Sequence, residues 1–440
     1  MCRIFFHKML RINHLRWFCG SVLGARLGVK SLFGLISCLF CLPFCACGGG
    51  EQGRSPAENA GYSCADSVVF ERMQYSGMLR LGVSCGIRLA DIRSVVGRDT
   101  LVKRFALVDS MRLAERGFDL GRLKRGREWK FATVLSVPLS RVVVLSSAQV
   151  GYMARLGVTG RIVGVGEGKY IADSSLYSRV VRGGATDSLP VAQLGNGTSL
   201  DYERLVAIKP DLVMTFATGG GEDDYARLEA LGLPVMLTSE WQEDSPLAKA
   251  EWIRLYGTLF GAGSADSVFE QSRKSYEAIR EGILAEPVPR PRVLAGMAYG
   301  GVWYAPGGRS YTAELIRDAG GRYLWEDDTT REMRLTLEEV LALSDSVDAW
   351  VNPGMFAKPS EILAVDPRVK GIKAFRDGRV CQNDARKGPG GGNDFYEGAV
   401  ARPAELLLNV TECLYFGSDS LKRRNLEVPP YKWYRNIFKL

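Results

Sequence analysis

The sequence predicts an α/β protein in which two lobes with parallel sheets are joined by one long helix. Three observations support this fold class. From residue 141 onward, short apolar runs alternate with amphipathic segments through short loops, which is typical of parallel sheets covered by helices. Residues 246–285 have a helical pattern of unusual length. A short αβ motif recurs on either side of that stretch, and 440 residues are enough for two or three domains.

Residues 1–46 have the layout of an export signal peptide. They contain six basic residues and no acidic one, and they end in an uncharged stretch that Pro43 interrupts. That stretch is shorter than the ~20 apolar residues needed to span a bilayer. Ala46 is followed by Cys47 and a glycine-rich segment, so the region resembles a bacterial lipoprotein signal with lipidation at Cys47. An ordinary cleaved signal or a short anchor is the alternative.

This leader accounts for most of the net charge of +8. Without it, 51 basic residues face 49 acidic ones, and that balance predicts no nucleic-acid partner. Both histidines, His7 and His14, lie in the leader, which excludes His-ligated zinc and histidine-based catalysis from the exported part. Beyond Cys47 four cysteines remain without CxxC spacing, so we expect no metal site. They allow three full disulfide pairings, and free buried thiols are the alternative; the four are Cys64, Cys85, Cys381 and Cys413.

Residues 47–63 are a flexible tether, and 64–140 form an N-terminal β-rich extension in which turn clusters indicate hairpins. The first α/β lobe spans 141–263. Its predicted strands are 142–145, 161–166, 211–217 and 235–238, and its predicted helices are 152–157, 200–209 and 225–231.

The interlobe helix is predicted at 264–286, after a break at Gly261–Gly263, and would be about 30 Å long. The second α/β lobe, with a C-terminal tail, spans 287–440. Its predicted strands are 292–298 and 348–352, and its predicted helices are 313–319 and 335–343.

An internal repeat supports two similar lobes. Residues 200–213 align with 335–350, and each copy has a polar helix-capping residue, an apolar helix face and then a strand. The capping residues are Asp201 and Thr336. Chance similarity between two αβ units is the alternative explanation.

Two stretches carry a resemblance to a known family. They are Leu200–Asp211 with the strand after it, and Tyr299–Gly307 followed by Asp318–Gly321. These stretches resemble the substrate-binding proteins of bacterial ABC importers for iron complexes and cobalamin, over about residues 141–416. The resemblance implies two Rossmann-like lobes with a ligand cleft between them, no enzymatic activity, and a permease dimer as partner. It also implies a lipid-anchored protein on the periplasmic or cell-surface side of a bacterial membrane.

The ligand site is predicted from the loops at the carboxyl ends of the strands, which would face the cleft. Aromatic side chains there would stack on a large ring ligand, and Arg386 and Lys387 would pair with its carboxylate or catecholate groups. Core packing of the aromatics and a solvated loop for the two cations are the alternatives. The predicted ligand-binding residues are Ser147, Lys169, Tyr170, Asn196, Thr218, Trp241, Tyr299, Trp303, Tyr304, Met355, Phe356, Arg386, Lys387 and Phe395.

The absence of histidine after His14 favours an organic iron complex (siderophore or haem) or a corrinoid as ligand, with no resident cofactor and no bare metal. The main alternative function is a binding module for another small organic ligand, and an exported enzyme is a weaker alternative. The glycine-rich Gly164–Gly168 has Lys169 where a dinucleotide fingerprint needs glycine, and Ser147 has no histidine to activate it.

Docking to the permease is predicted at one carboxylate on each lobe. By the resemblance, Glu222 in the first lobe and Glu361 in the second would engage arginines of the membrane subunits. The alternative for Glu222 is a favourable charge at a helix N-terminus.

Overall fold

The computed structural model describes residues 68–84, 86–113, 131–181, 190–221, 223–329, 331–416 and 432–439. All of them belong to one compact unit, Ala65–Leu440. The predicted signal peptide, the tether with Cys47, and Glu222, Cys64 and Cys85 lie outside the described residues.

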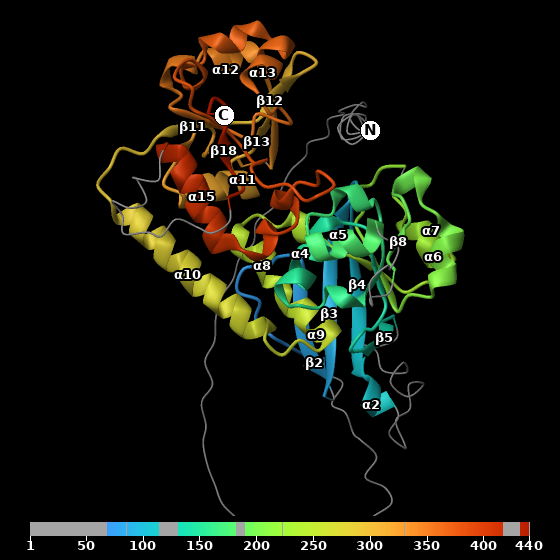
Figure 1. Cartoon of the computed structure of the whole chain (residues 1–440). Coiled ribbons are helices and arrows are strands. Elements are labelled where there is room, and N and C mark those ends of the chain that lie inside the picture. Colours follow the sequence, from blue (N-terminus) through green and yellow to red (C-terminus); the bar gives the residue numbers. More distant parts are fainter. Residues whose placement is uncertain are drawn as a thin grey trace, which may run out of the picture. The chain divides into compact units, whose positions relative to one another are not determined.

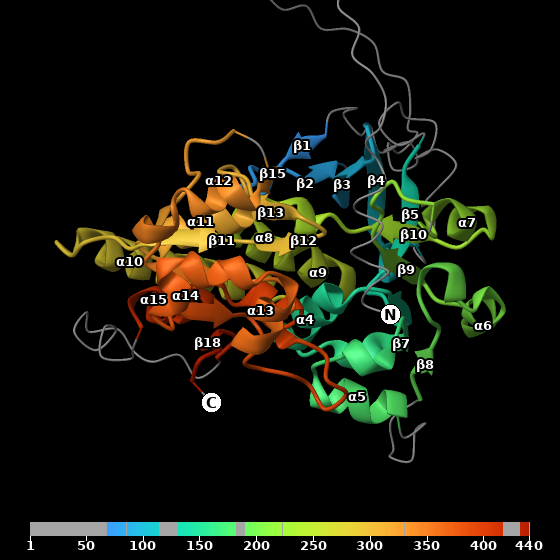
Figure 2. The same cartoon turned by 90° about the horizontal axis from the view of Figure 1, so that it is seen from above.

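The first lobe is a parallel sheet with the strand order β10–β9–β6–β7–β8. Its central strands are apolar and buried on both faces, which is why they read as continuous apolar runs in the sequence. Helices α6 and α7 cover one face of this sheet. Helices α4 and α5 lie on the other face, where they pack into the hydrophobic core (Figures 1 and 2). The strands are β6 Val142–Val144, β7 Ile162–Val165, β8 Ala192–Gln193, β9 Leu212–Thr215 and β10 Val235–Leu237, and the helices are α4 Ser147–Arg155, α5 Ser174–Val181, α6 Tyr202–Ile208 and α7 Tyr225–Ala230.

The second lobe has the strand order β14–β11–β16–β17–β18, parallel except for β18, which runs antiparallel to β17. A separate antiparallel sheet, β12–β13–β15, projects from it. The strands are β11 Arg292–Ala295, β12 Met297–Tyr299, β13 Val302–Pro306, β14 Arg322–Tyr323, β15 Glu332–Thr336, β16 Ala349–Val351, β17 Val380–Gln382 and β18 Arg435–Asn436. The helices are α11 Tyr311–Asp318, α12 Leu337–Leu341, α13 Pro359–Val365, α14 Lys373–Arg376 and α15 Pro403–Tyr415.

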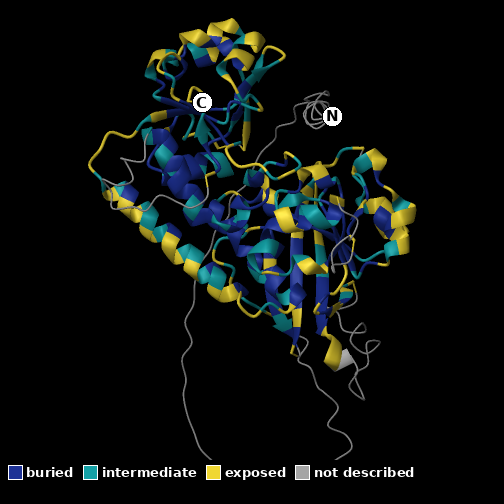
Figure 3. Ribbon diagram, in the orientation of Figure 1, coloured by how far each residue is buried: buried dark blue, intermediate teal, exposed yellow. Residues whose placement is uncertain are grey.

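The two lobes are connected by three consecutive helices, α8 Pro246–Glu251, α9 Ile253–Phe260 and α10 Ala265–Ala285. Gly261 ends α9 with φ of 68°, a left-handed conformation that glycine adopts without strain. The long helix α10 buries a stripe that includes Phe269, Tyr276 and Ile283, and exposes its other side to solvent (Figure 3). The predicted two-lobed α/β fold is confirmed, and α10 is the long helix of the connection.

The N-terminal extension forms a five-stranded sheet in the order β1–β2–β3–β4–β5, antiparallel except for the β4–β5 pair. Leu79, Ile92 and Phe105 on one of its faces belong to the same core cluster as α9 and the first-lobe strands. This sheet therefore shares a hydrophobic core with the first lobe. Its strands are β1 Val69–Phe70, β2 Leu79–Ser84, β3 Ile87–Val96, β4 Asp99–Asp109 and β5 Thr133–Val137, and the short helix α2 Ser110–Leu113 follows β4.

Two predicted elements differ from the structure. The predicted helix 335–343 begins as strand β15, because Leu335 pairs with Trp303 across the sheet, and helix α12 starts only at Leu337. The predicted strand 292–298 breaks at Gly296, whose φ of 99° turns the chain between β11 and β12. The predicted caps are confirmed: Asp201 accepts from the N–H of Arg204, and Thr336 accepts from the N–H of Glu339.

Cys381 on β17 and Cys413 on α15 form a disulfide with an S–S length of 2.05 Å. This bond is compatible with one of the three pairings that the sequence allowed, and it removes the free-thiol alternative for these two residues. Within the described residues no helix combines the length and the apolar character needed to cross a membrane.

Candidate functional site

The parallel order of the first-lobe strands places the loops after β6 to β10 at one edge of the sheet. Ser147 is the first residue of α4 and is half-buried, whereas Trp241 is 40% exposed and Tyr170 is 39% exposed. The remaining predicted residues of this lobe, Lys169, Asn196 and Thr218, are exposed at the same edge.

In the second lobe, Tyr299 and Tyr304 lie on β12 and β13 and are half-buried. Arg334 on the neighbouring strand β15 places its guanidinium 5.7 Å from the ring centre of Tyr304. Met355, which follows β16, is 61% exposed, and Phe356 next to it is half-buried.

Trp303 is a core residue, which corrects its predicted place in the ligand cleft. Side chains alternate along β13, so Trp303 points inward while Tyr304 points outward. Trp303 is fully buried, stacks near Trp350 with ring centres 5.3 Å apart, and donates its indole N–H to the carbonyl oxygen of Ala295 at 3.2 Å.

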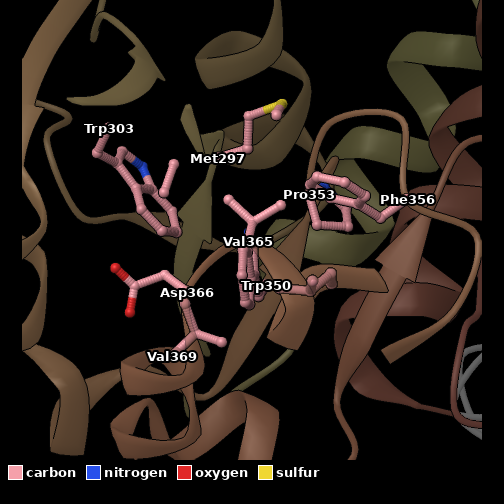
Figure 4. Close-up of a pocket in the computed structure, with 10 residues that line it drawn as sticks. Met297, Trp303, Trp350, Pro353, Phe356, Val365, Asp366 and Val369 are labelled. Carbon is pink, nitrogen blue, oxygen red and sulfur yellow. The ribbon is translucent and has the colours of Figure 1, made fainter. Parts of the chain in front are cut away.

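A small apolar cavity lies between this tryptophan pair and helix α13 (Figure 4). Its lining includes Met297, Pro353 and Phe356, and its volume is about 10 Å³. That volume has room for about one water molecule. The cavity is therefore too small for a haem or a corrinoid.

The two cations predicted to bind an anionic ligand already have partners. Arg386 Nε lies 2.8 Å from Asp394 Oδ2, and Lys387 Nζ lies 3.4 Å from Asp384 Oδ2. Both side chains remain about half exposed, with values of 47% and 50%. Lys169 has the same arrangement, because its ammonium group lies 2.5 Å from Glu167. A ligand would have to compete with these carboxylates.

The loop that carries Arg386 packs against the first lobe. A Cβ added at Gly392 would lie 2.2 Å from the carbonyl oxygen of Tyr170, and one added at Gly388 would lie 2.4 Å from Ala172 Cα. Ser147 Oγ lies 3.5 Å from the carbonyl oxygen of Tyr396. Glycines in this loop thus let the two backbones touch. Ser147 and Tyr170 are brought against the second lobe as a result.

Glu397 joins the lobes at this point, and sequence reasoning missed it. It is 2% exposed, and its carboxylate accepts the backbone N–H groups of Ala172 at 2.7 Å and Asp173 at 2.6 Å. Burial raises the pKa of Glu397 to about 8, although the two N–H donors oppose the shift. Phe395, two residues earlier, is half-buried against Tyr434, so it lies in this packed segment.

A second contact between the lobes is centred on Gln242. Arg331 of the second lobe donates to the Gln242 carbonyl oxygen at 2.7 Å and lies 2.9 Å from the Asp244 carboxylate. The buried side chain of Gln242 bonds to Val95 of the N-terminal sheet. The first-lobe loop that carries Trp241 is therefore held by contacts with both the second lobe and the N-terminal sheet.

Buried charges surround the start of α8. Burial lowers the pKa of Lys249 to about 8, and its ammonium group lies 3.8 Å from the centre of the Tyr311 ring. Glu240, 2% exposed, has a pKa raised by burial, and its Oε2 has no hydrogen-bond partner among the described residues. Nothing in the local sequence distinguishes Lys249 and Glu240 from exposed charged residues. Their burial depends on the segments that pack around them in the fold.

The N-terminal sheet is attached through two more buried carboxylates. Glu251 accepts the backbone N–H groups of Gln74, Tyr75 and Ser76 at 2.8–3.0 Å. Glu243 accepts the backbone N–H groups of Gly77 and Met78 and the Trp252 indole N–H at 2.8–3.2 Å, as well as the Ser76 hydroxyl. Burial raises the pKa of Glu243, and these donors oppose the shift.

The family model described as "Periplasmic binding protein" matches residues 142–386, which cover most of both lobes and the helix between them. The chain belongs to the periplasmic binding protein family. This is a family of binding proteins. The matched region begins after the N-terminal sheet and ends before Glu397.

This periplasmic binding protein has relatives in Methanocaldococcus jannaschii. It is 21% identical to an uncharacterized lipoprotein over 291 residues, which is 64% of this chain and 66% of the relative. A second uncharacterized lipoprotein is 22% identical over 312 residues, 66% of this chain and 74% of that relative. The chain thus spans just under two thirds of the first relative.

Three solved structures show the kinds of protein to which this periplasmic binding protein is similar. One is a possible iron-binding (periplasmic solute-binding) protein from Staphylococcus epidermidis, with 15% identity, a TM-score of 0.48, and coverage of 63% of this chain and 99% of that one. A periplasmic haem-binding protein from Pseudomonas aeruginosa has 20% identity, a TM-score of 0.47, and coverage of 63% and 93%. A periplasmic vitamin B12 binding protein from Vibrio cholerae has 15% identity, a TM-score of 0.44, and coverage of 63% and 98%.

Of the two predicted docking residues of this periplasmic binding protein, the structure describes only Glu361. Glu361 is exposed in the first turn of α13, where its carboxylate accepts the backbone N–H of Ala357 at 2.7 Å and of Lys358 at 3.3 Å. It therefore caps its own helix, and one face of the carboxylate stays open to solvent.

Proposed function

We propose that this protein is the substrate-binding component of an ABC importer, which captures an organic iron complex (siderophore or haem) or cobalamin and delivers it to a membrane permease. The observation that carries the proposal is the family match across two parallel-sheet lobes joined by α10. In such lobes the strand ends meet at one cleft, which suits capture of a small molecule.

The chemistry of the side chains supports an organic complex over a bare metal ion. The chain has no histidine after His14, so imidazole ligands are absent from the exported part. Trp241 and Tyr170 are the most exposed aromatic residues at the first-lobe edge. Their rings would stack on a porphyrin, a corrin or a catecholate.

The proposed location is the outer side of a bacterial membrane, with lipid on Cys47. Membrane partitioning of the full-length protein tests this point. We expect Cys47→Ala to release it into the soluble fraction, while Cys45→Ala stays on the membrane. Release of both variants, or of neither, would contradict the anchor.

The ligand is identified with three probes: a ferric tris-catecholate, haemin and cyanocobalamin. We expect calorimetry to give micromolar or tighter binding for one class, and we expect Trp241→Ala to weaken that binding at least tenfold. Phe131→Ala, which removes an aromatic side chain 84% exposed beside β5, is the matched control. No binding of any probe would contradict the proposal and favour a module for another ligand. Chemical turnover of a bound probe would favour an exported enzyme.

Docking to the permease is proposed at Glu222 and Glu361. Such charge pairs set orientation and encounter rate more than affinity. We expect Glu222→Arg with Glu361→Arg to abolish uptake of the ligand by cells and to leave ligand affinity unchanged. Reversal of two exposed carboxylates elsewhere, Glu203→Arg with Glu281→Arg, should leave uptake normal. Normal uptake by the first double variant would overturn this assignment.

A further inference from the structure

The turn between β3 and β4 of the N-terminal sheet reaches the edge of the first lobe where the ligand site is proposed. Strand β4 begins at this turn and ends near α2, at the opposite end of the sheet (Figure 1). The turn, Val96–Asp99, thus lies at the end of the sheet away from α2. We call these four residues the hairpin tip.

The hairpin tip is held against two first-lobe loops at once. Gln242, in the loop after β10, accepts from the Val95 N–H at 2.8 Å and donates to the Val95 carbonyl oxygen at 2.7 Å. Ser94 and Ser239 share a buried hydroxyl–hydroxyl hydrogen bond. In the loop after β9, a Cβ added at Gly219 would lie 2.3 Å from the Gly97 nitrogen. Both loops follow strand ends that face the proposed cleft.

The second lobe contacts the same place. Arg331 donates to the carbonyl oxygen of Gln242, whose side chain bonds to Val95, the residue before the hairpin tip. The first lobe, the second lobe and the N-terminal sheet therefore meet at Gln242, the residue next to Trp241 in the chain. The hairpin tip lies at the rim between the lobes.

Arg98 supplies an unpaired cation at this rim. Its side chain is exposed and makes no hydrogen bond or ion pair with any other described residue. Lys103 and Arg104, farther along β4, pair with Glu229 and Asp91. Asp223, on the loop beside Gly97, already accepts the backbone N–H groups of Thr218 and Gly219 at 2.6–3.0 Å. Asp99 is the carboxylate of the hairpin tip itself and is exposed.

We propose that the hairpin tip is a third wall of the ligand site, in which Arg98 contacts an anionic group of the bound ligand. The inference rests on the proposed function and narrows the ligand to a complex with carboxylate or catecholate groups at its periphery. A guanidinium pairs with such groups through two parallel hydrogen bonds. A corrinoid without peripheral anions would gain nothing from it.

Calorimetry with haemin and a ferric tris-catecholate tests the inference on the full-length protein. We expect Arg98→Glu to weaken the bound anionic probe at least tenfold, and Asp99→Asn to tighten it two- to threefold. Arg93→Glu is the matched control, because Arg93 is an exposed arginine on β3 about 10 Å before the turn. Thermal unfolding of each variant checks that the sheet is intact.

The outcomes separate the inference from the proposed function. Binding of an anionic probe by the parent protein with unchanged affinity in Arg98→Glu would overturn the third wall and leave the proposed function standing. An equal loss of affinity in Arg93→Glu and Arg98→Glu would also overturn the third wall, because the loss would then come from long-range electrostatic repulsion and not from a contact with Arg98. Tight binding of cyanocobalamin alone would overturn the proposed ligand class, because cyanocobalamin has neither carboxylate nor catecholate groups. No binding of any probe by the parent protein would overturn the proposed function, and this inference with it.

Discussion

The first lobe contacts the N-terminal sheet and the second lobe through buried carboxylates, but the two junctions are built differently. At the N-terminal junction, Glu243 and Glu251 accept five backbone N–H groups from Gln74–Met78, and a continuous apolar core backs them. At the lobe junction, Glu397 alone accepts two N–H groups, and close glycine contacts surround it.

The difference shows which junction belongs to the fold and which is an adjustable contact. A carboxylate that loses water needs several donors to stay charged at low cost. Glu251 accepts three backbone N–H groups, whereas Glu397 accepts two and has a pKa raised to about 8. We therefore expect the N-terminal sheet to unfold together with the first lobe, and the lobe junction to respond to pH and to small wedges.

The largest effect is expected at Glu251. Glu251→Ala would leave the N–H groups of Gln74, Tyr75 and Ser76 without their acceptor, so the free energy of unfolding should fall by about 3 kcal/mol or more. Urea denaturation measures it. Glu203→Ala, on the exposed side of α6, is the control and should change stability by less than about 0.5 kcal/mol. Equal values for the two variants would remove the distinction between the junctions.

A wedge in the lobe junction should have an intermediate effect. A Cβ at Gly151 of α4 would lie 1.8 Å from the Glu397 carbonyl oxygen, so Gly151→Ala must push the two segments apart, at a cost of about 1–3 kcal/mol. Hydrogen exchange of the Ala172 and Asp173 amides should become faster, because both donate to Glu397.

The control for this wedge is Gly282→Ala on α10, where an added Cβ meets nothing within 4 Å. Alanine is the better helix former, so this variant should gain about 0.5–1 kcal/mol. Unchanged amide exchange at 172 and 173 in Gly151→Ala would show that the two segments are not in contact in solution.

A further expected effect is a pH dependence of stability. Because the pKa of Glu397 is raised to about 8 in the folded protein, the folded state binds this proton more tightly than the unfolded state. Its contribution to stability is therefore complete below the unfolded pKa of about 4.5 and is lost as the pH rises toward 8. Glu397→Gln should lose this dependence between pH 5 and 8, as followed by thermal unfolding. The same pH profile in both proteins would contradict the shifted pKa.

Local pattern was enough to predict much of the fold. The apolar runs of β6 and β9, the caps at Asp201 and Thr336, and the length of α10 all depend on residues close together in the chain. The edge that carries Ser147 and Trp241 also followed from sequence, because parallel strands must end together.

The sequence by itself therefore determined the two lobes, their connecting helix and the edge at which a ligand is expected. Only the tertiary structure decided that Trp303 is buried, that Glu397 joins the lobes, and that the hairpin tip reaches the loop of Gln242. Glu397 and Ala172 are 225 residues apart, and Val95 and Gln242 are 147 apart. A buried carboxylate and an exposed one look alike in sequence. What separates them is which backbone N–H groups the fold brings to them, and this depends on packing between distant segments.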